Sequence, residues 1–122
     1  MQTTYAKNAY THVMITTSDI PLDLVIMLYD GAINYLRKVI FYINQSNTSK
    51  KIYYISKVMA IIEELLISLD MNAGGDIALN LRDLYIYILK ELTIANAKND
   101  IARVKHIESL LIELIAAWRK IK

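Results

Sequence analysis

The fold is decided by one stretch of the sequence, GGDIALNLRDLYIYILKELTIAN (residues 74–96). It opens with two glycines, which are typical of a turn, and with Asp76, an acidic N-cap candidate, and then continues as one helix of about six turns. Its apolar side chains fall on two adjacent lines, Ile77, Leu81, Leu84, Ile88 and Ala95 on the first and Ala78, Tyr85, Leu89, Leu92 and Asn96 on the second. Together the two lines are too wide for a single partner helix. This helix is therefore predicted to have neighbours on two sides.

Three further amphipathic segments have similar lengths, and we expect them to be helices at 22–44, 50–69 and 101–121. Pro21 suits the first turn of the first helix, and Asp100 is a reasonable N-cap for the last. Gly31 lies in mid-helix, where glycine is unfavourable, and this indicates a close approach of another backbone. Ile52 is expected to face inward. Four such helices with short links and no strand alternation predict an all-α fold, an antiparallel four-helix bundle.

Composition limits the class of protein. The chain has 122 residues, a length typical of one domain, and 55% of them are hydrophobic, which is high for a protein in water. Charged residues interrupt every long apolar run, so no segment resembles a membrane span of about 20 apolar residues. The net charge is only +2, and basic and acidic residues are mixed along the chain, so the sequence indicates no basic surface for binding nucleic acid. The remaining explanation for the apolar excess is a surface reserved for a partner protein.

The N-terminal residues 1–19 lack a sustained period, and we expect them to form a mobile or capping arm ahead of a bundle domain at 20–122. This segment also lacks the apolar core of a signal peptide. The absence of cysteine excludes disulfides and fits a reducing compartment.

A search for catalytic groups predicts that the protein is not an enzyme and has no cofactor or metal. The two histidines, His12 and His106, lack the spacing of a dimetal bundle, and zinc sites need several His or Cys. Glu63 and Glu64 are adjacent and point about 100° apart on a helix, so they cannot act as a facing acid–base pair.

Tyrosine accounts for nine of the eleven aromatic residues. Its apolar body and polar hydroxyl suit a surface that is exposed to solvent in the free protein and covered when a partner binds. Tyr85 and Tyr87 are separated by about 200° around their helix, so both cannot face the core. Ile86 and Ile94 align with charged residues on the expected outer face. An exposed apolar surface of this kind indicates use in binding.

Several motifs occur in the order typical of one family. LYDGAI at 28–33 is followed by IIEEL at 61–65 with SLD at 68–70, then GGDIA at 74–78, LYIY at 84–87, and AW at 117–118. This series resembles the FliS family of flagellin-specific export chaperones along essentially the whole chain. One departure is Ile20, which stands where the family usually places a serine. Another is the pair Ile86 and Ile94, at positions where relatives often carry polar residues.

The resemblance implies a cytoplasmic, non-catalytic four-helix bundle that binds the disordered C-terminal segment of flagellin. Such a chaperone prevents premature polymerisation and presents flagellin to the type III export gate. A co-chaperone or an anti-sigma factor is left open as a further partner, as is a homodimer. The alternative function is a self-associating structural bundle. The expected partner-binding residues are the family aromatics Tyr10, Tyr29, Tyr85 and Tyr87, and, from helix geometry, Val13, Ile33, Ile86, Leu89 and Ile94.

Overall fold

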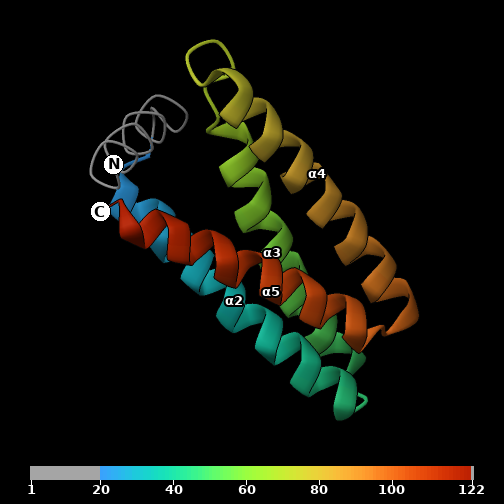
Figure 1. Cartoon of the computed structure of the whole chain (residues 1–122). Coiled ribbons are helices and arrows are strands. Elements are labelled where there is room, and N and C mark those ends of the chain that lie inside the picture. Colours follow the sequence, from blue (N-terminus) through green and yellow to red (C-terminus); the bar gives the residue numbers. More distant parts are fainter. Residues whose placement is uncertain (1–19, 122) are drawn as a thin grey trace.

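The computed structural model describes residues 20–121 and is helical almost throughout (Figure 1). Its described part contains four helices, α2 (Leu22–Asn44), α3 (Thr48–Ile67), α4 (Gly75–Lys98) and α5 (Ile101–Lys120). Successive helices run in opposite directions, as the short links require (Figure 1). The predicted fold class, an antiparallel four-helix bundle, is confirmed. The bounds differ by up to two residues: α3 begins and ends two residues earlier than expected, and α4 ends two residues later.

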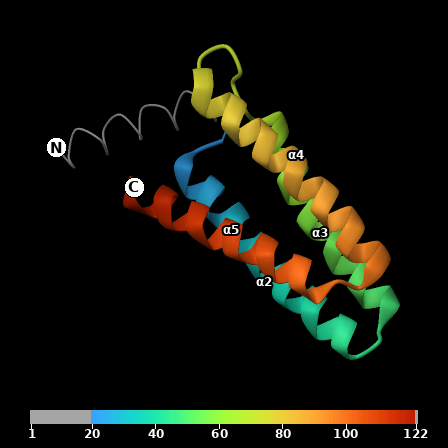
Figure 2. The same ribbon diagram turned by 45° about the vertical axis from the view of Figure 1, so that its right-hand side comes forward.

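The helices form a ring in which each packs mainly against two others. α2 packs against α3 and α5, and α4 packs against the same two helices. Figures 1 and 2 show that the start of α2, the end of α5 and the α3–α4 connection all lie at one end of the bundle. The α2–α3 side and the α4–α5 side are consequently opposite sides of the bundle.

The core is a set of buried stripes, one per helix. On α4 the buried stripe draws from both predicted lines and consists of Ala78, Leu81, Tyr85, Ile88, Leu92 and Ala95. Because α4 contacts α3 on one side and α5 on the other, the prediction of neighbours on two sides is confirmed.

Helix ends agree with some of the predicted caps. Asp100 is the N-cap of α5, where its carboxylate accepts a hydrogen bond from the backbone N–H of Arg103 at 3.1 Å. Pro21 is itself the N-cap of α2, one position before the predicted first turn. Asp76 does not cap α4; Gly74 occupies the N-cap position, and Asp76 lies in the first turn, where its charge still favours the helix dipole. Gly75 has a φ of +56°, as a turn glycine is free to adopt.

Lys51 is the one buried charged side chain among the described residues, and only 5% of it is exposed. Its Nζ donates to the carbonyl oxygen of Asn96 at 3.0 Å and to Oδ1 of Asn99 at 2.6 Å. Asn99 is the left-handed residue that ends α4, with a φ of 51°. A lysine from the first turn of α3 therefore caps the C-terminus of α4, where the helix dipole favours a positive charge.

One inward-facing prediction is wrong: Ile52 is 49% exposed, and Val58 and Ile55 are the buried residues of this part of α3. At Gly31 the nearest atom to an added Cβ would be Cδ1 of the Ile61 side chain at 3.7 Å, an ordinary contact. No backbone approaches closely enough to require glycine there.

Candidate partner-binding surface

The outer side of α4 carries an apolar surface between charged residues. Leu79, Ile86, Tyr87 and Ile94 are between 37% and 40% exposed, and we call these four residues the α4 surface. Buried side chains on the opposite stripe of α4 hold the helix against the bundle, so the α4 surface faces away from the core. The outward orientation predicted for Ile86 and Ile94 agrees with the structure. Leu79, which extends the same line toward the N-terminus of α4, was not among the predicted binding residues.

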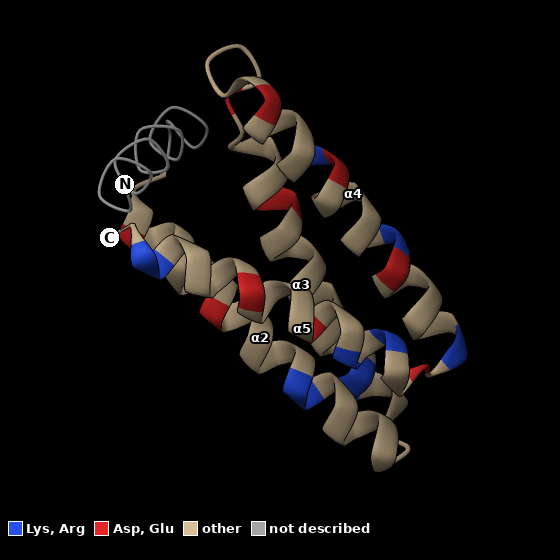
Figure 3. Ribbon diagram, in the orientation of Figure 1, with Lys and Arg blue, Asp and Glu red and all other residues tan. Residues whose placement is uncertain are grey.

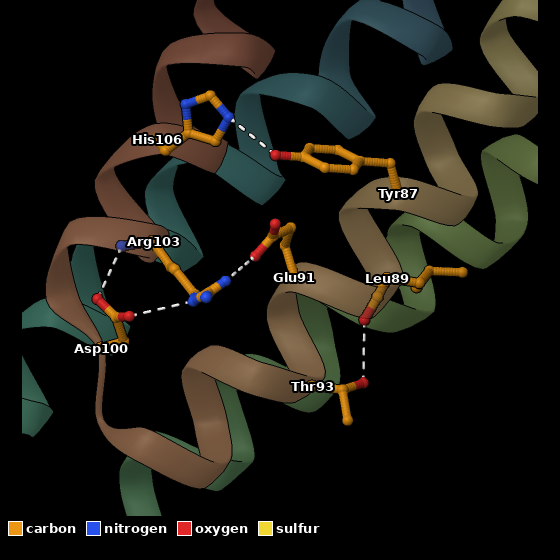
Figure 4. Close-up of polar contacts among 7 residues, drawn as sticks. All are labelled: Tyr87, Leu89, Glu91, Thr93, Asp100, Arg103 and His106. Carbon is orange, nitrogen blue, oxygen red and sulfur yellow. Dashed lines mark hydrogen bonds and ion pairs between the residues drawn. The ribbon is translucent and has the colours of Figure 1, made fainter.

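Tyr87 lies at the edge of this surface, next to α5. Its hydroxyl is 3.2 Å from Nε2 of His106, and the two rings meet edge to face with centroids 6.2 Å apart (Figure 4). Partial desolvation, and after it the nearby Glu91 carboxylate, raise the pKa of the Tyr87 hydroxyl, while Arg103 acts in the opposite direction. The polar tip of Tyr87 is thus oriented by α5, and its ring remains accessible.

A charged network below Tyr87 joins the two helices. Arg103 Nη1 donates to the Glu91 carboxylate at 2.6 Å, and Arg103 Nε donates to Asp100 at 3.1 Å (Figure 4). Both carboxylates are partly buried, and Arg103 is about one-third exposed. This network fixes the distance between α4 and α5 at the side on which Tyr87 lies.

Leu89 differs from the other predicted residues of α4. It is partly buried, packs against the core, and points away from α5 (Figure 4). Its carbonyl oxygen accepts a hydrogen bond from the Thr93 hydroxyl at 2.9 Å. Leu89 therefore supports the helix, and little of it is available to a partner.

Three other predicted binding residues lie in the core. Tyr29 and Tyr85 are fully buried, Ile33 is 4% exposed, and the hydroxyls of the two tyrosines are 2.5 Å apart. Burial raises the pKa of Tyr29 to about 12, against the opposing effects of Tyr85 and Trp118, and burial likewise raises the pKa of Tyr85. A partner that binds this conformation cannot reach these side chains. Tyr10 and Val13 lie outside the described residues.

The described region offers no sign of other chemistry. Within residues 20–121 no group of three or more His, Cys, Asp or Glu side chains could hold a metal ion. None of the four helices is long and apolar enough to cross a membrane.

Comparison with known proteins identifies the family. The model of the family described as "Flagellar protein FliS" matches residues 1–122. The chain belongs to the FliS family. The flagellar secretion chaperone FliS of Salmonella typhimurium is 34% identical over 99% of this chain and 93% of its own length. The protein of the same name from Campylobacter jejuni is 29% identical over 99% and 94%, and that from Vibrio cholerae is 36% identical over 83% and 74%. The similarity to these FliS proteins thus spans the bundle and the residues before it.

Proposed function

We propose that this protein is a flagellar secretion chaperone that binds the disordered C-terminal segment of flagellin. The match to the FliS family over the whole chain carries this proposal. In the cytoplasm the bound chaperone keeps flagellin from polymerising and supports its delivery to the flagellar type III export apparatus. These roles need recognition of an unfolded chain and no catalytic group.

The α4 surface is the proposed docking site for part of the flagellin segment. A disordered segment loses conformational freedom when it binds, so it needs several apolar anchors along an extended interface. Ile86 and Ile94 are two turns apart on one line and supply such anchors, and Tyr87 adds an oriented aromatic ring. Tyr10 of the N-terminal arm is proposed to contribute a further contact, as the family resemblance implies, and Val13 is proposed to contribute another from its place in the sequence pattern.

Titration with a peptide from the C-terminal region of flagellin of the same genome tests the function. Isothermal titration calorimetry is expected to show binding at micromolar protein. Failure to bind under these conditions would reject the flagellin assignment. Sedimentation velocity tests the alternative: a tight dimer that excludes the peptide would instead favour a self-associating bundle.

Paired substitutions test the surface. Ile86 and Ile94 are 38% and 37% exposed. Because full burial of one such side chain is worth about 1.5–3 kcal/mol, covering the exposed parts of both represents about 1–2 kcal/mol before binding costs. The double variant Ile86→Ser and Ile94→Ser is therefore expected to bind the peptide about 5- to 30-fold more weakly. Met27→Ser is the matched control, because Met27 is 67% exposed on α2, diagonally opposite α4. Equal affinities of the double variant and the control would exclude this surface.

Tyr10→Ala tests the arm. We expect it to weaken peptide binding while leaving the thermal unfolding midpoint nearly unchanged. An equal loss of stability would assign Tyr10 a structural role.

A further inference from the structure

A second surface, on the opposite side of the bundle from the α4–α5 side, combines tyrosines with lysines. Tyr54 of α3 stacks on Tyr42 of α2, with ring centroids 5.6 Å apart and planes 5° from parallel. Tyr54 also meets Tyr35 of α2 at 5.8 Å, and Tyr53 meets Tyr54 edge to face at 5.0 Å. The rings bridge α2 and α3, so they lie on the α2–α3 side.

Each of three lysines places its ammonium group over one of these rings. Lys38 lies 5.0 Å from the centroid of Tyr54, Lys50 lies 5.5 Å from Tyr42, and Lys57 lies 5.2 Å from Tyr53. In the described part of the chain, none of the three is paired with a carboxylate. We call the resulting set the tyrosine–lysine surface; it consists of Tyr42, Tyr53, Tyr54, Lys38, Lys50 and Lys57.

The charge of this region is one-sided. Residues 31–62 contain five lysine and arginine residues and no aspartate or glutamate, in a chain whose net charge is only +2. Figure 3 shows several basic residues toward the end of the bundle that holds the α2–α3 and α4–α5 connections, and a separate basic group at the end of α5, at the other end of the bundle. A polar pocket lined by Tyr42 and Lys51 continues the surface at this end. Of the five basic residues, Arg37 pairs with Glu108 of α5 and Lys51 is buried, which leaves the charges of Lys38, Lys50 and Lys57 over the surface. The field that these three lysines produce there is positive.

Apolar area lies between the charges. Phe41, Ile52 and Tyr53 are each about half exposed, between 49% and 54%. Exposed aromatic rings beside unpaired cations favour a ligand that offers both carboxylates and apolar side chains. Nucleic acid fits less well, because base stacking needs free ring faces. Here Tyr42 and Tyr54 stack on each other, and lysines lie over their rings.

We infer that the tyrosine–lysine surface is a docking site for an acidic, amphipathic segment of a partner protein other than flagellin. The carboxylates of that segment pair with the three lysines, and its apolar side chains pack on the exposed rings. Since this surface and the α4–α5 side are opposite, both partners are able to bind the same molecule. The independence of the two sites rests on the docking of flagellin at the α4 surface proposed above, whereas binding of the acidic segment itself rests on the rings and lysines of α2 and α3.

Fluorescence anisotropy with a labelled synthetic peptide, in which Asp and Glu are interspersed with Leu and Phe, tests the docking site. The full chain is expected to bind this peptide, and a peptide with Lys in place of every acidic residue is not expected to bind. The double variant Lys38→Glu and Lys50→Glu is expected to weaken binding at least about tenfold. Lys120→Glu, at the other end of the bundle, makes a control that changes the charge in the same direction and is expected to alter affinity less than about twofold.

The neutral variant Lys57→Gln keeps the test valid if the double reversal disturbs folding, and we expect it to weaken binding about threefold. Saturating flagellin C-terminal peptide is expected to leave the affinity for the acidic peptide unchanged. The proposal is overturned if the acidic peptide does not bind, if Lys120→Glu weakens binding as much as the double reversal, if the flagellin peptide displaces the acidic one, or if oligothymidylate binds more tightly than the acidic peptide.

Discussion

Replacing Tyr85 with phenylalanine removes one of the two hydroxyls that meet at 2.5 Å in the core. The Tyr29 hydroxyl is then left fully buried without this partner. A buried polar group that loses its hydrogen bond costs about 1–3 kcal/mol, a substantial part of a total stability on the order of 5–15 kcal/mol. For a chain of this length the thermal midpoint is expected to fall by about 4–12 °C.

A double-mutant cycle separates the hydrogen bond from the packing of the rings. Tyr29→Phe alone is expected to cost about as much as Tyr85→Phe, because it leaves the other hydroxyl unpaired. The double variant leaves no unpaired hydroxyl and is expected to lie within about 1 kcal/mol of the original protein. Urea unfolding followed by circular dichroism measures all four free energies, and Tyr53→Phe on the surface serves as a control with little expected change.

Additive costs in this cycle would refute the reasoning, since they would mean that the two hydroxyls do not depend on each other. Single variants that cost less than about 0.5 kcal/mol would refute it as well. Flagellin peptide binding to the folded single variants is expected to be unchanged, because both tyrosines are buried.

Three further predictions concern stability. Gly31→Ala is expected to stabilise the protein by about 1 kcal/mol, because the site has room for a Cβ and alanine favours the helix; an unchanged or lower urea midpoint would contradict this. Lys51→Met is expected to cost about 1–3 kcal/mol in urea unfolding, since two acceptors at the end of α4 lose their donor, whereas Lys120→Met should cost almost nothing. The free energy of unfolding is expected to fall as the pH rises from about 10 to about 12, because folded Tyr29 keeps a proton that the unfolded chain has released. Urea midpoints at about pH 9 and about pH 11 measure this loss of stability. A smaller loss in the double variant Tyr29→Phe and Tyr85→Phe confirms that the two tyrosines cause it.

The arrangement of the helices followed from the sequence because each helix has a regular apolar period and the links are short. The width of the apolar face of α4 correctly predicted two neighbours. The cap at Asp100 was also predictable, because it depends on residues within one turn. The burial of Lys51 was not, because its acceptors lie 45 and 48 residues away and come together with it only when the bundle forms.

The binding residues were harder to predict for the same reason. Periodicity showed that Tyr85 and Tyr87 could not both face the core, but it did not show which one does. Tyr85 is buried because the partner for its hydroxyl, Tyr29, is 56 residues away on a helix that faces it through the core. The tyrosine–lysine surface has a local signal in the sequence, the absence of acidic residues from 31 to 62, and charge counted by segment would have found it.

The contacts of Arg37 and Lys51 also bear on how the chain folds as it leaves the ribosome. The α2–α3 hairpin is made first, yet the carboxylate that pairs with Arg37 belongs to Glu108 of α5, and the acceptors of Lys51 belong to the end of α4. At a synthesis rate of about 5–20 residues per second, these groups follow several seconds later. Until then Arg37 and Lys51 of the first hairpin lack these partners. The bundle is therefore completed only after α5 has emerged.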